Sequence, residues 1–149
     1  MTLFDELATI TATLDASGIE YALVGGLAVA VWGAPRATAD IDLLIRPESV
    51  EAALAAVAPI DFRFPALPMT FKDGMSLQRV SKSTEGNLLT LDLLLVNANL
   101  EPVWASRQRF DVRGQTVWII SREALIQMKA AAGRPQDALD IQNLQEVDR

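Results

Sequence analysis

Residues Gly25–Ile45 read GGLAVAVWGAPRATADIDLLI. A glycine pair comes first, an apolar segment rich in Ala and Val follows, and two aspartates, Asp40 and Asp42, then open a second apolar run. The pattern predicts a tight turn leading into a helix over 27–32, and then a strand over 40–45. Residues two apart in a strand point to the same side, so the two aspartates project together. They need a cation, hydrogen-bond donors or open water, because a buried charge without a partner is costly.

The composition restricts the chemistry in which these aspartates can take part. The 149-residue chain has no cysteine and no histidine, which argues against thiolate metal sites, thiol nucleophiles and Ser-His-Asp catalysis. Catalysis must then rely on carboxylates, Lys, Arg and hydroxyl groups, a set that suits Mg²⁺. The formal net charge of -6 argues against indiscriminate binding of nucleic acid.

Length and hydropathy predict a single domain over 1–149. Hydrophobic residues make up 50% of the chain, which is enough for a substantial core. No apolar run reaches the roughly 20 residues of a membrane span, and no basic segment leads into a signal-like apolar core at the amino terminus. We therefore expect a cytoplasmic protein without a membrane partner.

Apolar spacing and turn residues predict alternating helices and strands. The expected helices cover residues 3–18, 27–32, 47–58, 121–133 and 135–147. The expected strands cover residues 21–24, 40–45, 88–96, 110–112 and 116–120, the last two as a hairpin, and residues 61–80 are expected to form irregular strands joined by loops. This order predicts an α/β fold with a mixed central sheet flanked by helices.

Two further features have both a functional and a structural interpretation. Asp92 lies in the middle of LLTLDLLLV, residues 88–96, where a central apolar strand should not tolerate a carboxylate without compensation. It is either a third member of a carboxylate cluster or a structural aspartate bonded to backbone donors. The pair Gly25-Gly26 either forms a plain tight turn or lets backbone N–H groups approach a phosphate closely.

Together these residues resemble the nucleotidyltransferase fold of the DNA polymerase beta superfamily. The shared pattern is Gly-Gly, a helix, the segment RATADID at 36–42 and a later aspartate, Asp92, in an apolar strand. Within the superfamily, the opening stretch and the tail LIQMKAAAGRPQDALDIQNL are most similar to small bacterial AbiEii-like nucleotidyltransferases of toxin-antitoxin systems. The resemblance extends from Tyr21 to Leu144.

The resemblance implies transfer of a nucleoside monophosphate from an NTP to an acceptor hydroxyl, with release of pyrophosphate. The implied catalytic and metal-binding residues, which would hold two Mg²⁺ ions, are Asp40, Asp42 and Asp92. The implied acceptor is an RNA, such as a tRNA end, or a protein, and a cognate toxin or antitoxin is an implied partner. The implied nucleotide-binding residues are Gly25, Gly26, Arg36, Thr38 and Lys129.

Several of these residues also have a structural interpretation. Arg36 can be an ion-pair partner of the aspartates, Thr38 a strand former, and Lys129 a solvated surface lysine. For the tail residues Arg134, Asp137 and Asp140 we favour an ion network at the start of a helix, and the three tryptophans are expected in the core or at its rim. A set of arginines in the carboxyl-terminal half forms either a local phosphate-binding face or scattered solvent charges: Arg107, Arg109, Arg113 and Arg122.

Two departures from the superfamily leave a second function open. Gly25-Gly26 stands where many members have Gly-Ser, so a hydroxyl contact to phosphate is absent. Larger relatives also append a domain that grips the acceptor, and we expect this chain to recognise an acceptor through its core surface, an oligomer or a partner. The alternative is a catalytically silent nucleotidyltransferase-like module that binds a toxin or antitoxin partner.

Overall fold

The structure, a computed structural model, describes residues 2–34 and 38–147. Its α-helices are α1 Leu3–Ala16, α2 Gly25–Val31, α3 Val50–Val57, α4 Glu101–Ala105, α5 Arg122–Ala132 and α6 Pro135–Gln145. Its strands are β1 Tyr21–Val24, β2 Asp40–Ile45, β3 Phe64–Pro65, β4 Met69–Thr70, β5 Ser76–Thr84, β6 Asn87–Leu95, β7 Gln108–Val112 and β8 Gln115–Ile119. Short 3₁₀ turns lie at Pro47–Ser49, Ala58–Ile60 and Ala98–Leu100.

The strands of the described chain form one mixed sheet in the order β3-β5-β6-β2-β1-β8-β7, and β4 pairs with β5 beside this path. Strands β2 and β6 run parallel, as do β1 and β8, and the other neighbouring pairs are antiparallel. The register of β2 and β6 places Asp42 opposite Asp92. The two carboxylate-bearing segments that the sequence separates are therefore neighbours in the sheet.

The helices are placed by apolar stripes and by caps. Leu7, Ile10 and Leu14 of α1 are fully buried, and Thr2 and Asp5 form a capping box at its start. Helix α5 begins after Ser121, whose side chain accepts from the Ala124 N–H, and ends at Gly133 in the left-handed conformation. Both ends of the predicted helix at 121–133 are thereby confirmed.

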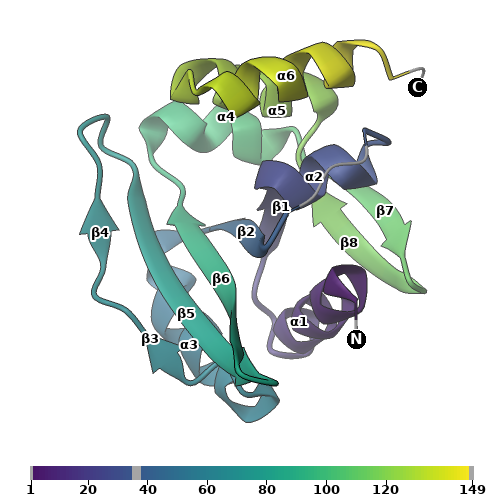
Figure 1. Ribbon diagram of the computed structural model, residues 1–149. Coiled ribbons are helices and arrows are strands. Elements are labelled where there is room, and N and C mark those ends of the chain that lie inside the picture. Colours follow the sequence, from purple (N-terminus) through teal and green to yellow (C-terminus); the bar gives the residue numbers. More distant parts are fainter. Residues whose placement is uncertain (1, 35–37, 148–149) are drawn as a thin grey trace.

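Figure 1 shows how the helices surround the sheet. Helices α4, α5 and α6 gather at one end, the top of the view, where α5 packs against α2, α4 and α6. Helices α1 and α3 pack against each other in the lower half. In the ranges that the structure describes, no helix has the length and apolarity needed to cross a membrane.

The mixed α/β architecture predicted from the sequence is confirmed, and the differences are local. Helix α2 begins at Gly25, two residues before the prediction, and the predicted helix over 47–58 is regular only between Val50 and Val57, with 3₁₀ turns on both sides. Helix α4 was not predicted, because five residues are too few for a helical period to show. The segment at 61–80, predicted as irregular, contains the first half of the long regular strand β5.

Strand β6 is central, as predicted, but it is not buried along its whole length. It lies between β5 and β2, and Leu91, Asp92 and Leu93 are buried, whereas Leu88 is 68% exposed. The pairing of β6 with β2 starts only at Thr90, so its first residues extend beyond β2 and pair with β5 alone. The apolar residues on both faces of this segment predict a strand that is buried throughout, whereas its first residues are exposed.

Candidate active site

A cleft of about 360 Å³ opens where β1 ends and β2 begins. Its floor comes from the sheet and its far wall from α5 and α6. Five of the residues predicted from the sequence line it: Gly25, Asp40, Asp42, Asp92 and Lys129. The apolar part of the lining includes Phe71, Met75, Leu77, Leu94 and Met128, none of which the sequence singled out.

Gly25 makes room for Asp42. The backbone of Gly25 has a φ of +74°, and a Cβ added there would lie 2.2 Å from Asp42 Oδ2. Only glycine combines this left-handed conformation with so close an approach. The glycine pair is thus more than a turn, because its first member leaves the space that the carboxylate occupies.

The carboxylates repel one another in this cleft. Burial raises the pKa of Asp42 to about 7, and the negative charges of Asp92 and Asp40 act in the same direction, while Lys129 opposes them. Asp42 therefore keeps its proton to a higher pH than an ordinary aspartate does. A cation placed among these oxygens would restore the charged form.

Arg79 of β5 is a charged residue of this site that was not identified from the sequence. Its Nε donates to Asp92 Oδ1 at 2.8 Å and its Nη2 donates to Asp92 Oδ2 at 3.0 Å, a bidentate pair across neighbouring strands. This hydrogen bonding raises the pKa of Arg79. The pair supplies the compensation that a carboxylate in an apolar strand requires. The donor is the Arg79 side chain rather than the backbone donors that the structural interpretation expected, and the membership of Asp92 in a carboxylate cluster stays a prediction.

The residues of the cleft suit Mg²⁺ in their chemistry. Carboxylate oxygens are the ligands that this ion prefers, and the repulsion at Asp42 is what a divalent cation would relieve. In the described ranges, however, no three acidic side chains are grouped as a ready metal site. Both oxygens of Asp92 instead accept hydrogen bonds from Arg79.

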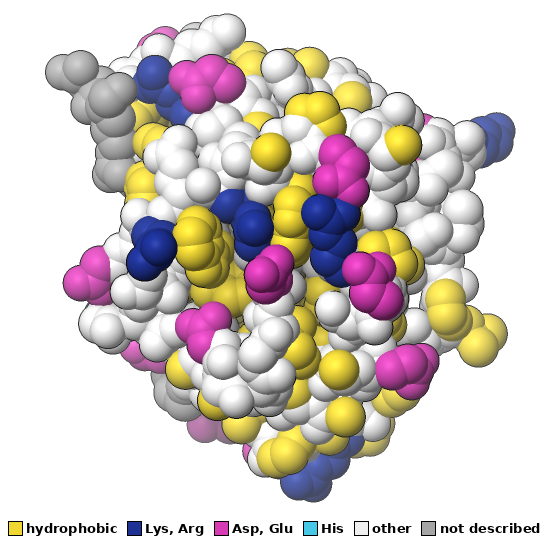
Figure 2. All heavy atoms as spheres, turned by 180° about the vertical axis from the view of Figure 1, so that it is seen from behind, with side chains coloured by type: hydrophobic (Ala, Val, Ile, Leu, Met, Phe, Trp, Pro, Cys, Tyr) yellow, Lys and Arg dark blue, Asp and Glu magenta, His cyan; other side chains and the backbone are white. Residues whose placement is uncertain are grey.

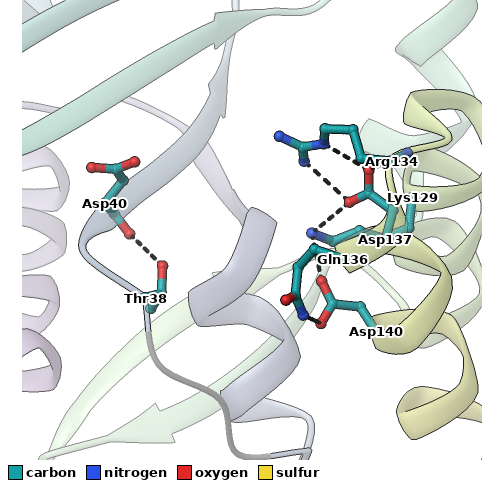
Figure 3. A network of polar contacts seen from close by, with 7 residues as sticks. All are labelled: Thr38, Asp40, Lys129, Arg134, Gln136, Asp137 and Asp140. Carbon is teal, nitrogen blue, oxygen red and sulfur yellow. Dashed lines mark hydrogen bonds and ion pairs between the residues drawn. The ribbon is translucent and has the colours of Figure 1, made fainter.

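Lys129 lies in a buried ion network between α5 and α6 (Figure 3). Its Nζ is 3.3 Å from Asp137 Oδ1 and 3.1 Å from Asp140 Oδ2, and both aspartates are fully buried. Arg134 donates from Nε at 2.7 Å and from Nη2 at 3.1 Å to Asp137, and this bonding lowers the pKa of Asp137 to about 2. The predicted network at the start of the last helix is confirmed, and Lys129, at 6% exposure, is not a solvated surface lysine.

Of the remaining predicted binding residues, Gly26 and Thr38 are not among the residues that line the cleft. Gly26 is buried in the first turn of α2. The Thr38 hydroxyl donates to the Asp40 carbonyl at 3.5 Å, as Figure 3 shows, so it faces the start of β2. Arg36 lies outside the described residues.

The arginines of the carboxyl-terminal half do not form one phosphate-binding face. Arg107 stacks between Trp104 and Trp118, at 4.0 and 5.2 Å from the ring centroids, and Arg109 lies 4.8 Å from Trp118. Arg113 approaches α1 and Arg122 donates to the Val147 carbonyl. On the face shown in Figure 2, basic, acidic and hydrophobic side chains are intermingled rather than gathered by type.

Solved structures share this fold. The lincosamide antibiotic adenylyltransferase LnuA, solved with lincomycin bound, is 16% identical, with 97% of each chain covered and a TM-score of 0.67. The structure of ANT(2'')-Ia in complex with adenylyl-2''-tobramycin is 17% identical, covering 97% of this chain and 88% of that one, with a TM-score of 0.65. An antigenic nucleotidyltransferase-like protein from Paracoccidioides brasiliensis is 19% identical, covering 96% and 73%, also with a TM-score of 0.65.

This likeness shows that the chain has the fold of the nucleotidyltransferase class. The family model described as "Nucleotidyltransferase of unknown function (DUF6036)" matches residues 1–149, and the chain belongs to this family. No curated protein matches the sequence.

Proposed function

We propose that this protein transfers a nucleoside monophosphate from a Mg²⁺-bound NTP to an acceptor hydroxyl. The observation that carries the proposal is the position of Asp42, which faces Asp92 across parallel strands in a cleft and has a pKa raised to about 7. Carboxylates that repel one another lower the stability of the folded protein, but in a binding cleft the same carboxylates can hold cations. The family assignment and the two adenylyltransferase structures support the same chemistry.

Each residue then has a role in the transfer. Asp40, Asp42 and Asp92 would hold two Mg²⁺ ions, which supply charge neutralisation for the phosphates and for the pyrophosphate that leaves. Gly25 and Gly26 would admit the triphosphate from the backbone side, with Thr38 and Arg36 at the nucleotide. Lys129, held by two buried aspartates, would direct its positive charge toward the cleft.

The reaction forms one bond and breaks one. The acceptor oxygen bonds to the α-phosphorus of the NTP while the bond from that phosphorus to the β-phosphate bridging oxygen breaks. Asp92 lines the same cleft as Asp42 and, once an oxygen is released from Arg79, would accept the hydroxyl proton there.

The acceptor has three candidate classes. The sequence resemblance favours an RNA end or a protein hydroxyl, within a toxin-antitoxin system of the AbiEii type. LnuA was solved with lincomycin and ANT(2'')-Ia with adenylyl-2''-tobramycin, so a small hydroxylated molecule is the third candidate acceptor. Incubation with each α-³²P-labelled NTP and separate RNA, protein and metabolite fractions distinguishes them, because the label moves into one class.

Calorimetric titration tests the central proposal. The four NTPs are titrated with and without Mg²⁺ into the wild type, Asp42→Asn and the control Asp61→Asn, which makes the same charge change at a surface ion pair with Arg63. We expect Mg²⁺-dependent binding in the wild type and the control, and a loss of about tenfold or more in Asp42→Asn, because a ligand charge is removed without a change of shape.

Two outcomes contradict the proposal. Unchanged metal-dependent affinity in Asp42→Asn would show that the cleft is not the metal site. No NTP binding by the folded wild type would favour the silent partner-binding module, for which the engagement of Asp92 by Arg79 is the structural argument.

A further inference from the structure

Arg79 is positioned as a counter-ion inside the cleft. It belongs to β5, and the register of β5 with β6 places it directly opposite Asp92. The Asp92 side chain is 8% exposed, whereas the Arg79 side chain is 42% exposed, so the guanidinium reaches a buried carboxylate from the solvent side. Both carboxylate oxygens accept from it. A bidentate pair of this kind is strong and fixes the orientation of the carboxylate.

The other two cations of the cleft are engaged elsewhere. Lys129 pairs with Asp137 and Asp140, and Arg134 pairs with Asp137. Among the described residues that line the cleft, Arg79 therefore provides the one ion pair to the carboxylates Asp40, Asp42 and Asp92.

We propose that Arg79 acts as a built-in competitor of the divalent cation. It holds Asp92 while the metal site is empty, and Asp92 can join Asp42 in binding a metal ion only when the guanidinium moves away. The inference rests on the proposed function, because it assumes that the carboxylates bind a divalent cation.

Charge and freedom of movement both support this exchange. A guanidinium and a divalent cation that approach the same carboxylate repel each other, so binding of one weakens binding of the other. The partly exposed Arg79 side chain can swing into solvent without leaving a buried charge unpaired, provided that the metal ion takes its place at Asp92. The exchange therefore makes metal binding weaker than the three carboxylates alone would allow.

Binding of Mn²⁺ in the absence of nucleotide tests the proposal. Free Mn²⁺ is measured by electron paramagnetic resonance during titration of the wild type, Arg79→Gln, Arg79→Lys and Arg63→Gln. Arg63→Gln is the matched control, since it removes one arginine from a surface pair with Asp61. We expect Arg79→Gln to bind Mn²⁺ about tenfold more tightly than the wild type, because one competing charge is lost. Arg79→Lys, which keeps the charge without the bidentate fork, should fall between them, and the control should match the wild type.

Whether Arg79→Gln strengthens or weakens Mn²⁺ binding distinguishes competition from a merely structural role of Arg79. If Arg79 only orients Asp92 as a ligand, its removal weakens Mn²⁺ binding, and weaker or unchanged binding in Arg79→Gln would overturn the inference. Urea unfolding of each variant confirms that the compared proteins are folded.

Asp42→Asn distinguishes this failure from that of the proposed function. In one outcome the wild type binds Mn²⁺, Asp42→Asn does not, and Arg79→Gln binds it no more tightly than the wild type. The metal site is then supported, and only the proposed role of Arg79 is rejected. If neither the wild type nor Arg79→Gln binds Mn²⁺, both the inference and the metal-dependent function are rejected.

Discussion

The Asp42 side chain fills the space beside Gly25, and no room is left there for a side chain on residue 25. The positive φ of Gly25 and the 2.2 Å that would separate an added Cβ from Asp42 Oδ2 explain why this turn needs glycine. In the sequence, the pair Gly25-Gly26 is compatible with an ordinary turn. The contact with Asp42 arises because β1 and β2 are antiparallel neighbours, with Val24 opposite Asp42.

Gly25→Ala should therefore lower the free energy of unfolding by about 3 kcal/mol, which combines left-handed strain with displacement of the Asp42 carboxylate. It should also abolish Mg²⁺-dependent NTP binding. The matched control is Gly18→Ala, since Gly18 has a φ of +71° and no atom within 4 Å of the added Cβ. The control should cost only about 1 kcal/mol. Equal losses in urea unfolding would contradict the steric argument.

The titration of Asp42 predicts how stability depends on pH. Its pKa rises from 3.8 to about 7 on folding, so between these values the folded protein holds a proton that the unfolded chain has released. Because the unfolded state binds fewer protons in this window, this group makes the free energy of unfolding fall as the pH rises from about 4 to about 7.

Asp42→Asn removes this contribution. The pKa of Asp42 rises by about three units, and one unit corresponds to about 1.4 kcal/mol. The free energy of unfolding of the variant, relative to that of the wild type, should therefore be higher at pH 8 than at pH 4 by on the order of 4 kcal/mol. Urea unfolding in the presence of a chelator measures both proteins at the two pH values. If the difference in free energy of unfolding between Asp42→Asn and the wild type is the same at both pH values, the pKa of Asp42 is not raised by folding.

Helices α5 and α6 are joined through charge as well as apolar contact. Lys129 on α5 reaches Asp137 and Asp140 on α6, and all three side chains are buried. Removing one member of such a group leaves the others as uncompensated buried charges. The network therefore fixes the wall of the cleft that faces the carboxylates.

Lys129→Met should lower the free energy of unfolding by about 3–5 kcal/mol, because two buried aspartates lose their partner. The control is Arg134→Gln, which also removes a cation from Asp137 but at a side chain that is 70% exposed, and it should cost about 1 kcal/mol. Thermal unfolding at pH 7 measures both. Comparable small losses would mean that Lys129 is solvated and free to serve the nucleotide alone.

Secondary structure was predictable where a local period or cap defines an element. Strands β1 and β2 and helix α5 lie at the predicted residues, because a short apolar run ended by glycines, an apolar run opened by two aspartates, a serine cap and a terminal glycine are all local signals. Strand β5 was only partly predicted, since its polar and apolar residues do not alternate cleanly. Arg79 was missed for that reason.

The whole molecule carries a net charge of -6, yet its cleft contains three basic side chains, Arg79, Lys129 and Arg134. Each is paired with an aspartate, so the cleft is lined by ion pairs rather than by free positive charge. A triphosphate would therefore gain little from electrostatic attraction without a divalent cation. The overall acidity is consistent with the proposal that NTP binding depends on Mg²⁺, which the titration above tests.

The sequence by itself determined the α/β class, the common direction of Asp40 and Asp42, and the candidate role of Asp92, because each depends on residue type and on spacing within one element. Only the tertiary structure decided that Asp92 faces Asp42 on one side and Arg79 on the other, and that Lys129 is buried between two aspartates. These contacts depend on the order β5-β6-β2 and on the packing of α5 against α6. Strand order and helix packing are set by the fit of the whole core, which no local pattern encodes.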